Sequence, residues 1–211
     1  MVKPKGNLSQ PLAPELLYPE KRVAGVDEVG RGAWFGPVVA AAVILPVSAY
    51  ASLAAEGIRD SKRLSAKRRK ELDAAIRAIS LDVQIGFAAA EEIDRVNILQ
   101  ASLRAMERAV GALHPPPQLC LIDGRYRLPN LSLEQETLVK GDATSLVIAA
   151  ASIVAKVWRD ELIVQWSEQY PQYQLAANKG YGTKAHRLAI QEYGVSPYHR
   201  RSFRPCQLGD G

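Results

Sequence analysis

The chain has 211 residues, of which 47% are hydrophobic and 23% are charged, an ordinary composition for one globular domain with a sizeable core. It has no apolar run of the roughly 20 residues that a membrane-spanning helix needs, no signal-peptide pattern and only two cysteines, so we expect a soluble cytoplasmic protein that has no contact with a membrane. The net charge is +5, but residues 59–71 and residues 178–204 each sum to +5, which fits both a polyanion-binding face and two solvated helix surfaces.

The first predicted elements are two strands and a helix. Residues 1–21 are rich in proline and predict an extended arm. Residues 22–28 and 37–45 are apolar runs on either side of a glycine-rich turn, and they pair most simply as a hairpin. Residues 66–79 place apolar side chains at helical spacing after Ser65, a good N-cap, and therefore predict a helix.

The middle of the chain alternates between strands and helices. Residues 81–89 alternate in polarity as a strand does, and residues 91–113 predict an amphipathic helix of about six turns. LCLIDG, residues 119–124, is typical of a central strand that is covered on both faces. TLVKGD, residues 137–142, looks like another strand end, and a helix rich in small residues should follow to about residue 169.

The last segment predicts a loop over residues 178–183, a short helix over residues 186–194 and an irregular basic tail. Together, the elements predict an α/β fold: a mixed sheet of about five strands with flanking helices and a helical C-terminal extension. We expect one domain over residues 22–204, followed by a flexible tail over residues 205–211.

Four acidic residues share one position in this scheme, at or just after the end of a strand. Asp27 and Glu28 close the first strand, Asp123 closes LCLIDG, and Asp142 follows LVKG. Strand ends are where ligand groups converge in α/β sheets, although Asp-Gly pairs also form simple turns. Oxygen ligands without His or Cys favour Mg²⁺ or Mn²⁺, and two such ions can support phosphodiester hydrolysis.

Six separated motifs, in one order along residues 22–204, resemble those of the ribonuclease HII family: GVDEVGRGAWFGPVVAAAVIL, DSKRLS, LIDG, KGDATSLVIAAASIVAKVWRD, NKGYGTKAH and HRRSF. The resemblance implies a ribonuclease H-like fold, a cytoplasmic location and hydrolysis that depends on Mn²⁺ or Mg²⁺. The substrates would be RNA/DNA hybrids and single ribonucleotides in duplex DNA, cut on the 5′ side of the ribonucleotide to leave 3′-hydroxyl and 5′-phosphate ends.

The resemblance also implies residue roles. Asp27, Glu28, Asp123 and Asp142 match the family's metal-binding acids. One departure is the segment after the GRG motif, which reads Ala-Trp-Phe at residues 33–35 where the family commonly has a Pro-Leu-Ala-like segment.

Two motifs are candidates for recognition of the ribonucleotide. In the GRG motif, Gly30, Arg31 and Gly32 permit close backbone approach, so their amides could reach the 2′-hydroxyl group, although most such motifs are only turns. Tyr181, between two glycines, resembles the family's tyrosine that stacks on the sugar after the ribonucleotide. An aromatic residue in such a loop is otherwise more often a packing anchor.

Other residues are candidates for contacts with phosphate groups. They are Ser61, Lys62, Lys179 and Lys184, and the other cations of residues 63–69 are expected to form a solvated helix face at least in part. His186 and His199 lie in basic segments and are expected to face phosphate, with no catalytic role.

Two alternatives remain beside this interpretation. A type 3 ribonuclease H shares the fold and the acids but carries an additional N-terminal substrate-binding domain, which twenty proline-rich residues cannot form. A non-catalytic module that binds RNA/DNA hybrids would use the basic stretches and keep the acids for structure. We expect a monomer in either case.

Overall fold

The centre of the protein is a five-stranded mixed sheet with the strand order β3-β2-β1-β4-β5. The computed structural model describes residues 13–58 and 64–209. Its strands are β1 (Val23–Val29), β2 (Val38–Ile44), β3 (Asp82–Ala88), β4 (Leu119–Asp123) and β5 (Glu134–Leu138). The predicted mixed sheet is therefore confirmed, and so is the predicted hairpin, because β1 and β2 are antiparallel neighbours.

The parallel half of the sheet brings three strand ends to one edge. β1 pairs in parallel with β4, with Gly25 opposite Leu121, and β4 pairs in parallel with β5, with Asp123 opposite Leu138. The carboxyl ends of these three strands therefore point the same way.

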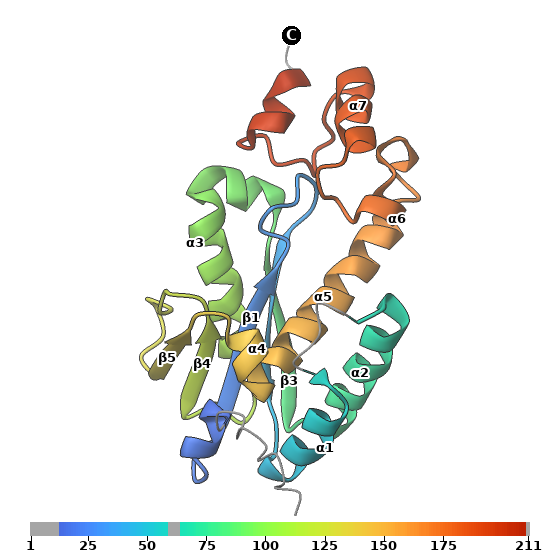
Figure 1. Ribbon diagram of the computed structural model, residues 1–211. Coiled ribbons are helices and arrows are strands. Elements are labelled where there is room, and N and C mark those ends of the chain that lie inside the picture. Colours follow the sequence, from blue (N-terminus) through green and yellow to red (C-terminus); the bar gives the residue numbers. More distant parts are fainter. Residues whose placement is uncertain (1–12, 59–63, 210–211) are drawn as a thin grey trace, which may run out of the picture.

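Helices cover both faces of the sheet (Figure 1). They are α1 (Tyr50–Ala55), α2 (Ala66–Ile79), α3 (Ala90–Gly111), α4 (Gly141–Thr144), α5 (Leu146–Trp166), α6 (Leu175–Asn178) and α7 (Lys184–Tyr193). Alternation along β4 assigns the faces, since Leu119 and Leu121 belong to the core under α5 and α2, whereas Cys120 and Ile122 belong to the core under α3. Such two-sided burial is what the all-apolar run predicts.

Helix α5 lies against β1 without an intervening side chain. A Cβ atom at Gly25 would lie 2.0 Å from the carbonyl carbon of Val147, so only glycine allows this approach. The helix begins at the N-cap Ser145, whose hydroxyl accepts a hydrogen bond from the Ile148 amide at 3.3 Å. This contact sets where the next turns of α5 meet the ends of the strands.

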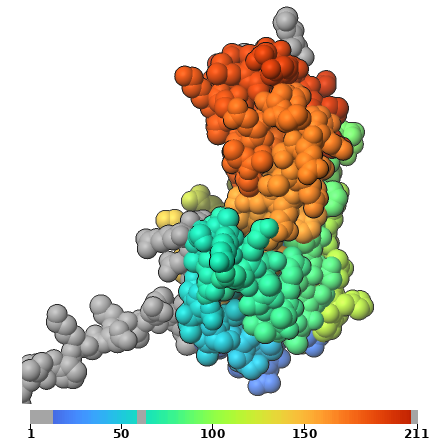
Figure 2. Space-filling model, turned by 90° about the vertical axis from the view of Figure 1, so that its right-hand side faces the viewer, coloured from blue at the N-terminus to red at the C-terminus, as the bar shows by residue number. Residues whose placement is uncertain are grey.

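The segments after α5 extend beyond the sheet as a helical cap, which is orange to red in Figures 1 and 2. A third apolar cluster joins this cap to the loop after β1 through Phe35, which is buried against Ile163, Tyr173 and Ile190. The predicted helical C-terminal extension is present, and it covers the glycine-rich loop between β1 and β2.

Two predicted helices can be compared with the structure in detail. Helix α2 has the predicted bounds and the predicted N-cap, since Ser65 Oγ accepts from the Arg68 amide at 3.2 Å. The single helix of six turns is wrong, because Asn97 has φ 67° and ψ 165° and interrupts α3. Its side chain caps the second part, with Oδ1 accepting from the amides of Leu99 and Gln100 at 3.0 and 3.1 Å.

Short 3-10 segments occur next to both ends of the predicted domain. Residues Pro14–Leu17 form a 3-10 turn, and the buried Glu15 accepts a hydrogen bond from the Leu146 amide at 2.7 Å. At the other end of the described chain, a 3-10 segment spans Arg204–Gly209. The division into arm, domain and tail stays a prediction. Within residues 13–58 and 64–209, no helix is both long and apolar enough to cross a membrane.

Candidate active site

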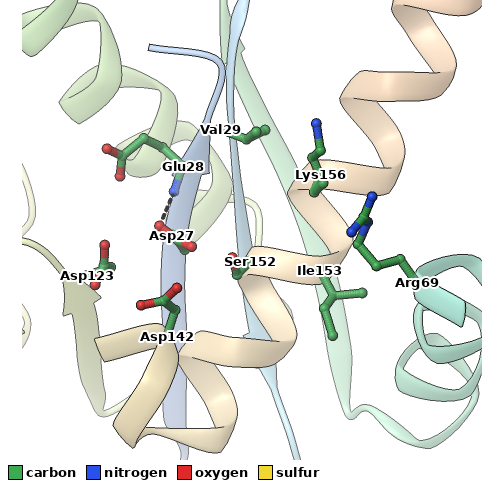
Figure 3. Close-up of a pocket in the computed structure, with 9 residues that line it drawn as sticks. All are labelled: Asp27, Glu28, Val29, Arg69, Asp123, Asp142, Ser152, Ile153 and Lys156. Atoms are coloured by element: carbon green, nitrogen blue, oxygen red, sulfur yellow. Dashed lines mark hydrogen bonds between the residues drawn. The ribbon is translucent and has the colours of Figure 1, made fainter. Parts of the chain in front are cut away.

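The four predicted acids line one cleft at the carboxyl edge of the sheet (Figure 3). The cleft has a volume of ≈ 430 Å³ and is lined by Asp27, Glu28, Val29, Arg69, Asp123, Asp142, Ser152, Ile153 and Lys156. The acids lie on one side of it, whereas Arg69 and Lys156 lie on the other side (Figure 3). Acids that are up to 115 positions apart in the chain therefore share one site, since the outermost two are residues 27 and 142.

Three elements place these carboxyl groups. Asp27 and Glu28 lie at the end of β1, and Asp123 is the last residue of the neighbouring β4. Asp142 differs slightly from the prediction, because it lies in the short helix α4, which follows β5, rather than at the strand end itself. The Gly141 amide donates to Asp123 Oδ1 at 2.7 Å, so the start of α4 is joined directly to the end of β4.

Burial and like charge raise the pKa of Asp27 well above its ordinary value. Burial is the largest cause, followed by the negative charges of Glu28 and Asp123, while a hydrogen bond with Ser152 acts in the opposite direction. Burial also raises the pKa of Glu28, although its ion pair with Arg31, 3.1 Å from Nη1 to Oε1, opposes the shift. The cleft thus holds carboxyl groups whose ionisation a nearby cation would favour.

The chemistry of the donors fits a hard divalent cation. The cleft offers carboxylate oxygens and the Ser152 hydroxyl, with neither thiol nor imidazole among its lining groups. Within the described part of the chain, no three His, Cys, Asp or Glu side chains already surround a single point as ligands would.

The sequence did not single out Ser152 and Lys156, and it left Arg69 among the cations of a solvated face. Arg69 faces the cleft, whereas its neighbours Arg68 and Lys70 form exposed ion pairs with glutamates. Ser152 and Lys156 are one helical turn apart on α5, and this i, i+4 spacing was the available signal. Both side chains reach the cleft because α5 lies directly against β1.

Two loops meet beside this cleft: the GRG loop, which joins β1 to β2 and contains residues 30–36, and the Tyr181 loop, residues 178–183. Tyr181 forms an isolated β-bridge with Ala33, and the Gly180 carbonyl accepts hydrogen bonds from the amides of Trp34 and Phe35 at 2.8 and 3.2 Å. The departure at residues 33–35 is thus part of the contact between the loops, where its backbone rather than its side chains makes the hydrogen bonds.

Two buried arginines hold the loop between β1 and β2, and one of them, Arg159, also joins it to the loop that contains Tyr181. Arg159 donates to the carbonyl oxygens of Pro37, Phe35 and Lys179 at 3.0, 2.9 and 2.9 Å, and its guanidinium carbon lies 5.4 Å from the centre of the Tyr181 ring. Arg200 donates to the carbonyl oxygens of Gly36 and Arg31 at 3.0 and 2.9 Å. Neither arginine was singled out from the sequence.

The two glycines of the GRG motif differ in their surroundings. Gly30 has φ 93°, and a Cβ atom there would lie 2.2 Å from Arg159 Nε. At Gly32, nothing lies within 4 Å of such an atom, and the residue is exposed. Gly30 therefore serves the packing of the loop on Arg159, whereas Gly32 leaves space on the outer side of the loop.

The residues predicted to contact phosphate groups lie in different parts of the structure, and their contacts stay a prediction. Ser61 and Lys62 lie outside the described residues. Lys184 is exposed at the start of α7, and Lys179 lines a second groove that begins beside Arg69. The prediction that His186 and His199 face phosphate is wrong, because their side chains are buried and hydrogen-bonded to each other.

Comparisons with known proteins agree on one family. The family model described as Ribonuclease HII matches residues 24–206. A ribonuclease HII of Trichormus variabilis is 58% identical over 186 residues, which cover 88% of this chain and 83% of that protein. The crystal structure of ribonuclease H2 from Pyrococcus horikoshii is similar with a TM-score of 0.74 and 26% identity over 88% of this chain and 95% of that one.

The fold is also similar to that of a ribonuclease HIII. The structure of Bst-RNase HIII in complex with Mn²⁺ has a TM-score of 0.73 and 23% identity, covering 99% of this chain and 75% of that one. At this identity the likeness concerns the fold alone.

Proposed function

This chain belongs to the ribonuclease HII family and is therefore a ribonuclease H, an endoribonuclease, and we propose that it cuts on the 5′ side of ribonucleotides paired with DNA. The substrates are the RNA strand of RNA/DNA hybrids and single ribonucleotides within duplex DNA. The products carry 3′-hydroxyl and 5′-phosphate ends. Family membership argues against a hybrid-binding module without activity and against the type 3 alternative.

One observation carries the chemical part of this proposal: four carboxyl groups from three elements line a single cleft opposite Arg69 and Lys156. A phosphodiester that enters this cleft meets cationic side chains on one wall and carboxylates on the other. The cationic wall can hold the phosphate groups that flank the cut, because both charged ends belong to long side chains that reach into the cleft. Without a compensating cation, the acidic wall would repel the substrate.

Asp27, Glu28, Asp123 and Asp142 would hold two Mn²⁺ or Mg²⁺ ions. When bound, such ions activate the attacking water and stabilise the leaving 3′ oxygen. Backbone amides hold two of these carboxylates in place. The Gly141 amide donates to Asp123 Oδ1, and the Glu28 amide donates to Asp27 Oδ1, each at 2.7 Å.

Recognition of the ribonucleotide is assigned to the two joined loops. Gly32 is exposed, and nothing lies within 4 Å of the position of a Cβ atom there, so a substrate strand can come close to its backbone and present the 2′-hydroxyl group, which distinguishes RNA from DNA. Tyr181 is half-exposed, with Lys156 Nζ and Arg159 Cζ at 5.6 and 5.4 Å from the centre of its ring, and the ring can stack on the following deoxyribose. Lys62, Lys179 and Lys184 would contact phosphate groups further along the strands.

The test is cleavage by purified protein that has been stripped of metal ions. Three matched duplexes are compared with and without added Mn²⁺ or Mg²⁺: one with a single ribonucleotide, one with a full RNA strand and one entirely of DNA. We expect metal-dependent cuts on the 5′ side of the ribonucleotide in the first and along the RNA in the second, with no cleavage of the third.

End analysis then separates the parts of the proposal. A 5′-phosphate on the downstream product supports the assigned chemistry. Cleavage without any divalent ion contradicts the metal assignment, and cleavage of the hybrid alone contradicts the recognition of single ribonucleotides.

A further inference from the structure

Two histidines outside the cleft form a buried pair behind the Tyr181 loop. His186 is on α7 and His199 is in the irregular segment after it, and their side chains are 0% and 1% exposed. Their Nε2 atoms are 3.0 Å apart, and His186 Nδ1 is 3.0 Å from the Tyr181 carbonyl oxygen. The pair therefore connects α7 and the segment after it directly to the residue proposed to recognise the substrate sugar.

Hydrogen-bond donors determine where each proton lies in this pair. The Ser196 amide is 2.9 Å from His199 Nδ1 and can only donate, so this nitrogen accepts and neutral His199 carries its proton on Nε2. His199 Nε2 then donates to His186 Nε2, which leaves the proton of His186 on Nδ1. His186 Nδ1 in turn donates to the Tyr181 carbonyl, and the chain of hydrogen bonds runs in a single direction.

The surroundings keep both rings neutral and in place. Burial is the main cause that lowers the pKa of both histidines, to about 3 for His199. The His186 ring lies 5.4 Å from that of Trp34, and the His199 ring makes edge contacts with Phe35 and Tyr173, centroid to centroid, at 5.1 and 4.6 Å. Trp34 and Phe35 follow the GRG motif, so the pair is packed against both recognition loops.

We propose that His186 and His199 are positioning residues for Tyr181, which hold its backbone so that its ring faces the sugar beside a ribonucleotide. The Tyr181 amide already donates to the Asn178 carbonyl at 2.9 Å, and His186 holds the carbonyl at the other side of the residue. This inference rests on the proposed recognition of single ribonucleotides by Tyr181. It assigns the histidines no contact with substrate.

The test compares two substitutions that remove the same ring. His186→Asn keeps an N–H donor close to the position of Nδ1, whereas His186→Leu has similar bulk without a donor. For each variant, kcat/KM is measured on the duplex with a single ribonucleotide and on the RNA/DNA hybrid, and the ratio of the two values is the readout. Tyr181→Ala and the double variant Tyr181→Ala/His186→Leu complete a thermodynamic cycle.

We expect His186→Leu to lower the ratio by no more than Tyr181→Ala does; a lost stacking contact costs about 5- to 150-fold on the single ribonucleotide, which is the upper limit for the fall in the ratio. His186→Asn should retain most of the ratio. In the Tyr181→Ala background, His186→Leu should leave the ratio unchanged, because the ring through which it acts is gone. A merely structural role would instead lower both activities equally and would persist in that background, which would overturn the inference.

Two further results keep this inference distinct from the proposed function. If Tyr181→Ala itself leaves the ratio unchanged, both the stacking role and this inference are wrong, whereas a normal Tyr181 effect with an unchanged ratio for His186→Leu overturns the inference alone. The ¹⁵N shifts of the histidine rings in the unmodified protein, which need no variant to fold, should show Nδ1–H on His186 and Nε2–H on His199 at neutral pH. The opposite tautomers would also overturn it.

Discussion

The acidic cleft gathers groups of like charge, whereas the loops beside it surround one buried charge, that of Arg159, with hydrogen-bond acceptors. In the cleft, burial and neighbouring carboxylates raise the pKa of Asp27. Beneath the loops, Arg159 is fully buried, and each of its three nitrogens donates to a carbonyl oxygen. Under the proposed function, a bound cation would offset the repulsion in the cleft, whereas the hydrogen bonds of Arg159 already hold the loops together without substrate.

Removing one carboxylate charge from the cleft should leave the protein folded but should greatly lower its turnover. Asp123→Asn keeps an oxygen that can accept from the Gly141 amide but removes one negative charge. We expect turnover to fall by about 1000-fold or more, since several kcal/mol of transition-state stabilisation depend on the bound cations. The metal-free variant should melt about 2–4 °C higher for each kcal/mol of repulsion relieved.

Glu168→Gln is the matched control, because Glu168 is exposed and lies outside the cleft lining. It should change neither turnover nor the melting temperature. Single-turnover kinetics in saturating Mn²⁺ and a thermal melt without metal give the two readouts, and near-normal cleavage by Asp123→Asn would contradict the role assigned to this acid.

In the loop region, the ring of Tyr181 should matter more than its hydroxyl group. Tyr181→Phe keeps the flat face above Arg159 and should cut almost normally, whereas Tyr181→Ala should lose about 5- to 150-fold on a single ribonucleotide. The loss should be smaller on continuous RNA, which does not always offer a deoxyribose at that position. Equal losses on both substrates together with a lower melting temperature would mean that the ring is a packing anchor.

Within the GRG motif, one glycine packs against the buried Arg159 and the other is exposed, so the two can be compared by substitution. Gly30→Ala forces a Cβ atom against Arg159 in a left-handed backbone conformation, so it should lower the free energy of unfolding by about 1–3 kcal/mol. Gly32→Ala meets nothing within 4 Å and should change stability by less than about 0.5 kcal/mol. Urea denaturation checks both values.

Cleavage by the same pair of variants then tests the role of Gly32. If the substrate backbone approaches this residue, Gly32→Ala should raise KM in the absence of any loss of stability. Equal stability losses for the two variants would contradict the separation of a packing glycine from a substrate-facing one.

The acids could be predicted from sequence because each lies at or after the end of a recognisable strand, and the ends of neighbouring parallel strands lie together. Asp142 shows the limit of that argument, since the four-residue helix α4 is too short to leave a periodic pattern. Asn97 is a related case. The apolar spacing continues through it, and only its capping preference indicated that α3 is interrupted.

The loop region was harder to predict, because its contacts join segments that are distant in the chain. Arg159 left one signal that was not used: it continues the four-residue spacing of Ala151, Ala155 and Ile163, all fully buried. The histidine pair left none. A histidine in a basic segment is as compatible with a surface site as with a buried one, and only the packing of the cap against the GRG loop separates these outcomes.

Lys184 offers the smallest and most specific test, because folding and binding should respond to it in opposite directions. It is the first residue of α7, where a positive charge is unfavourable to the helix dipole by about 0.3–1 kcal/mol. Lys184→Gln should therefore leave the melting temperature unchanged or slightly higher. If the side chain contacts phosphate, the variant should also flatten the slope of log affinity against log salt by up to about one unit. Lys21→Gln is the control, since Lys21 precedes β1, at the opposite end of that strand from the cleft, and is paired with Glu134. A salt slope that Lys184→Gln leaves unchanged would mean that this lysine is only part of a solvated surface.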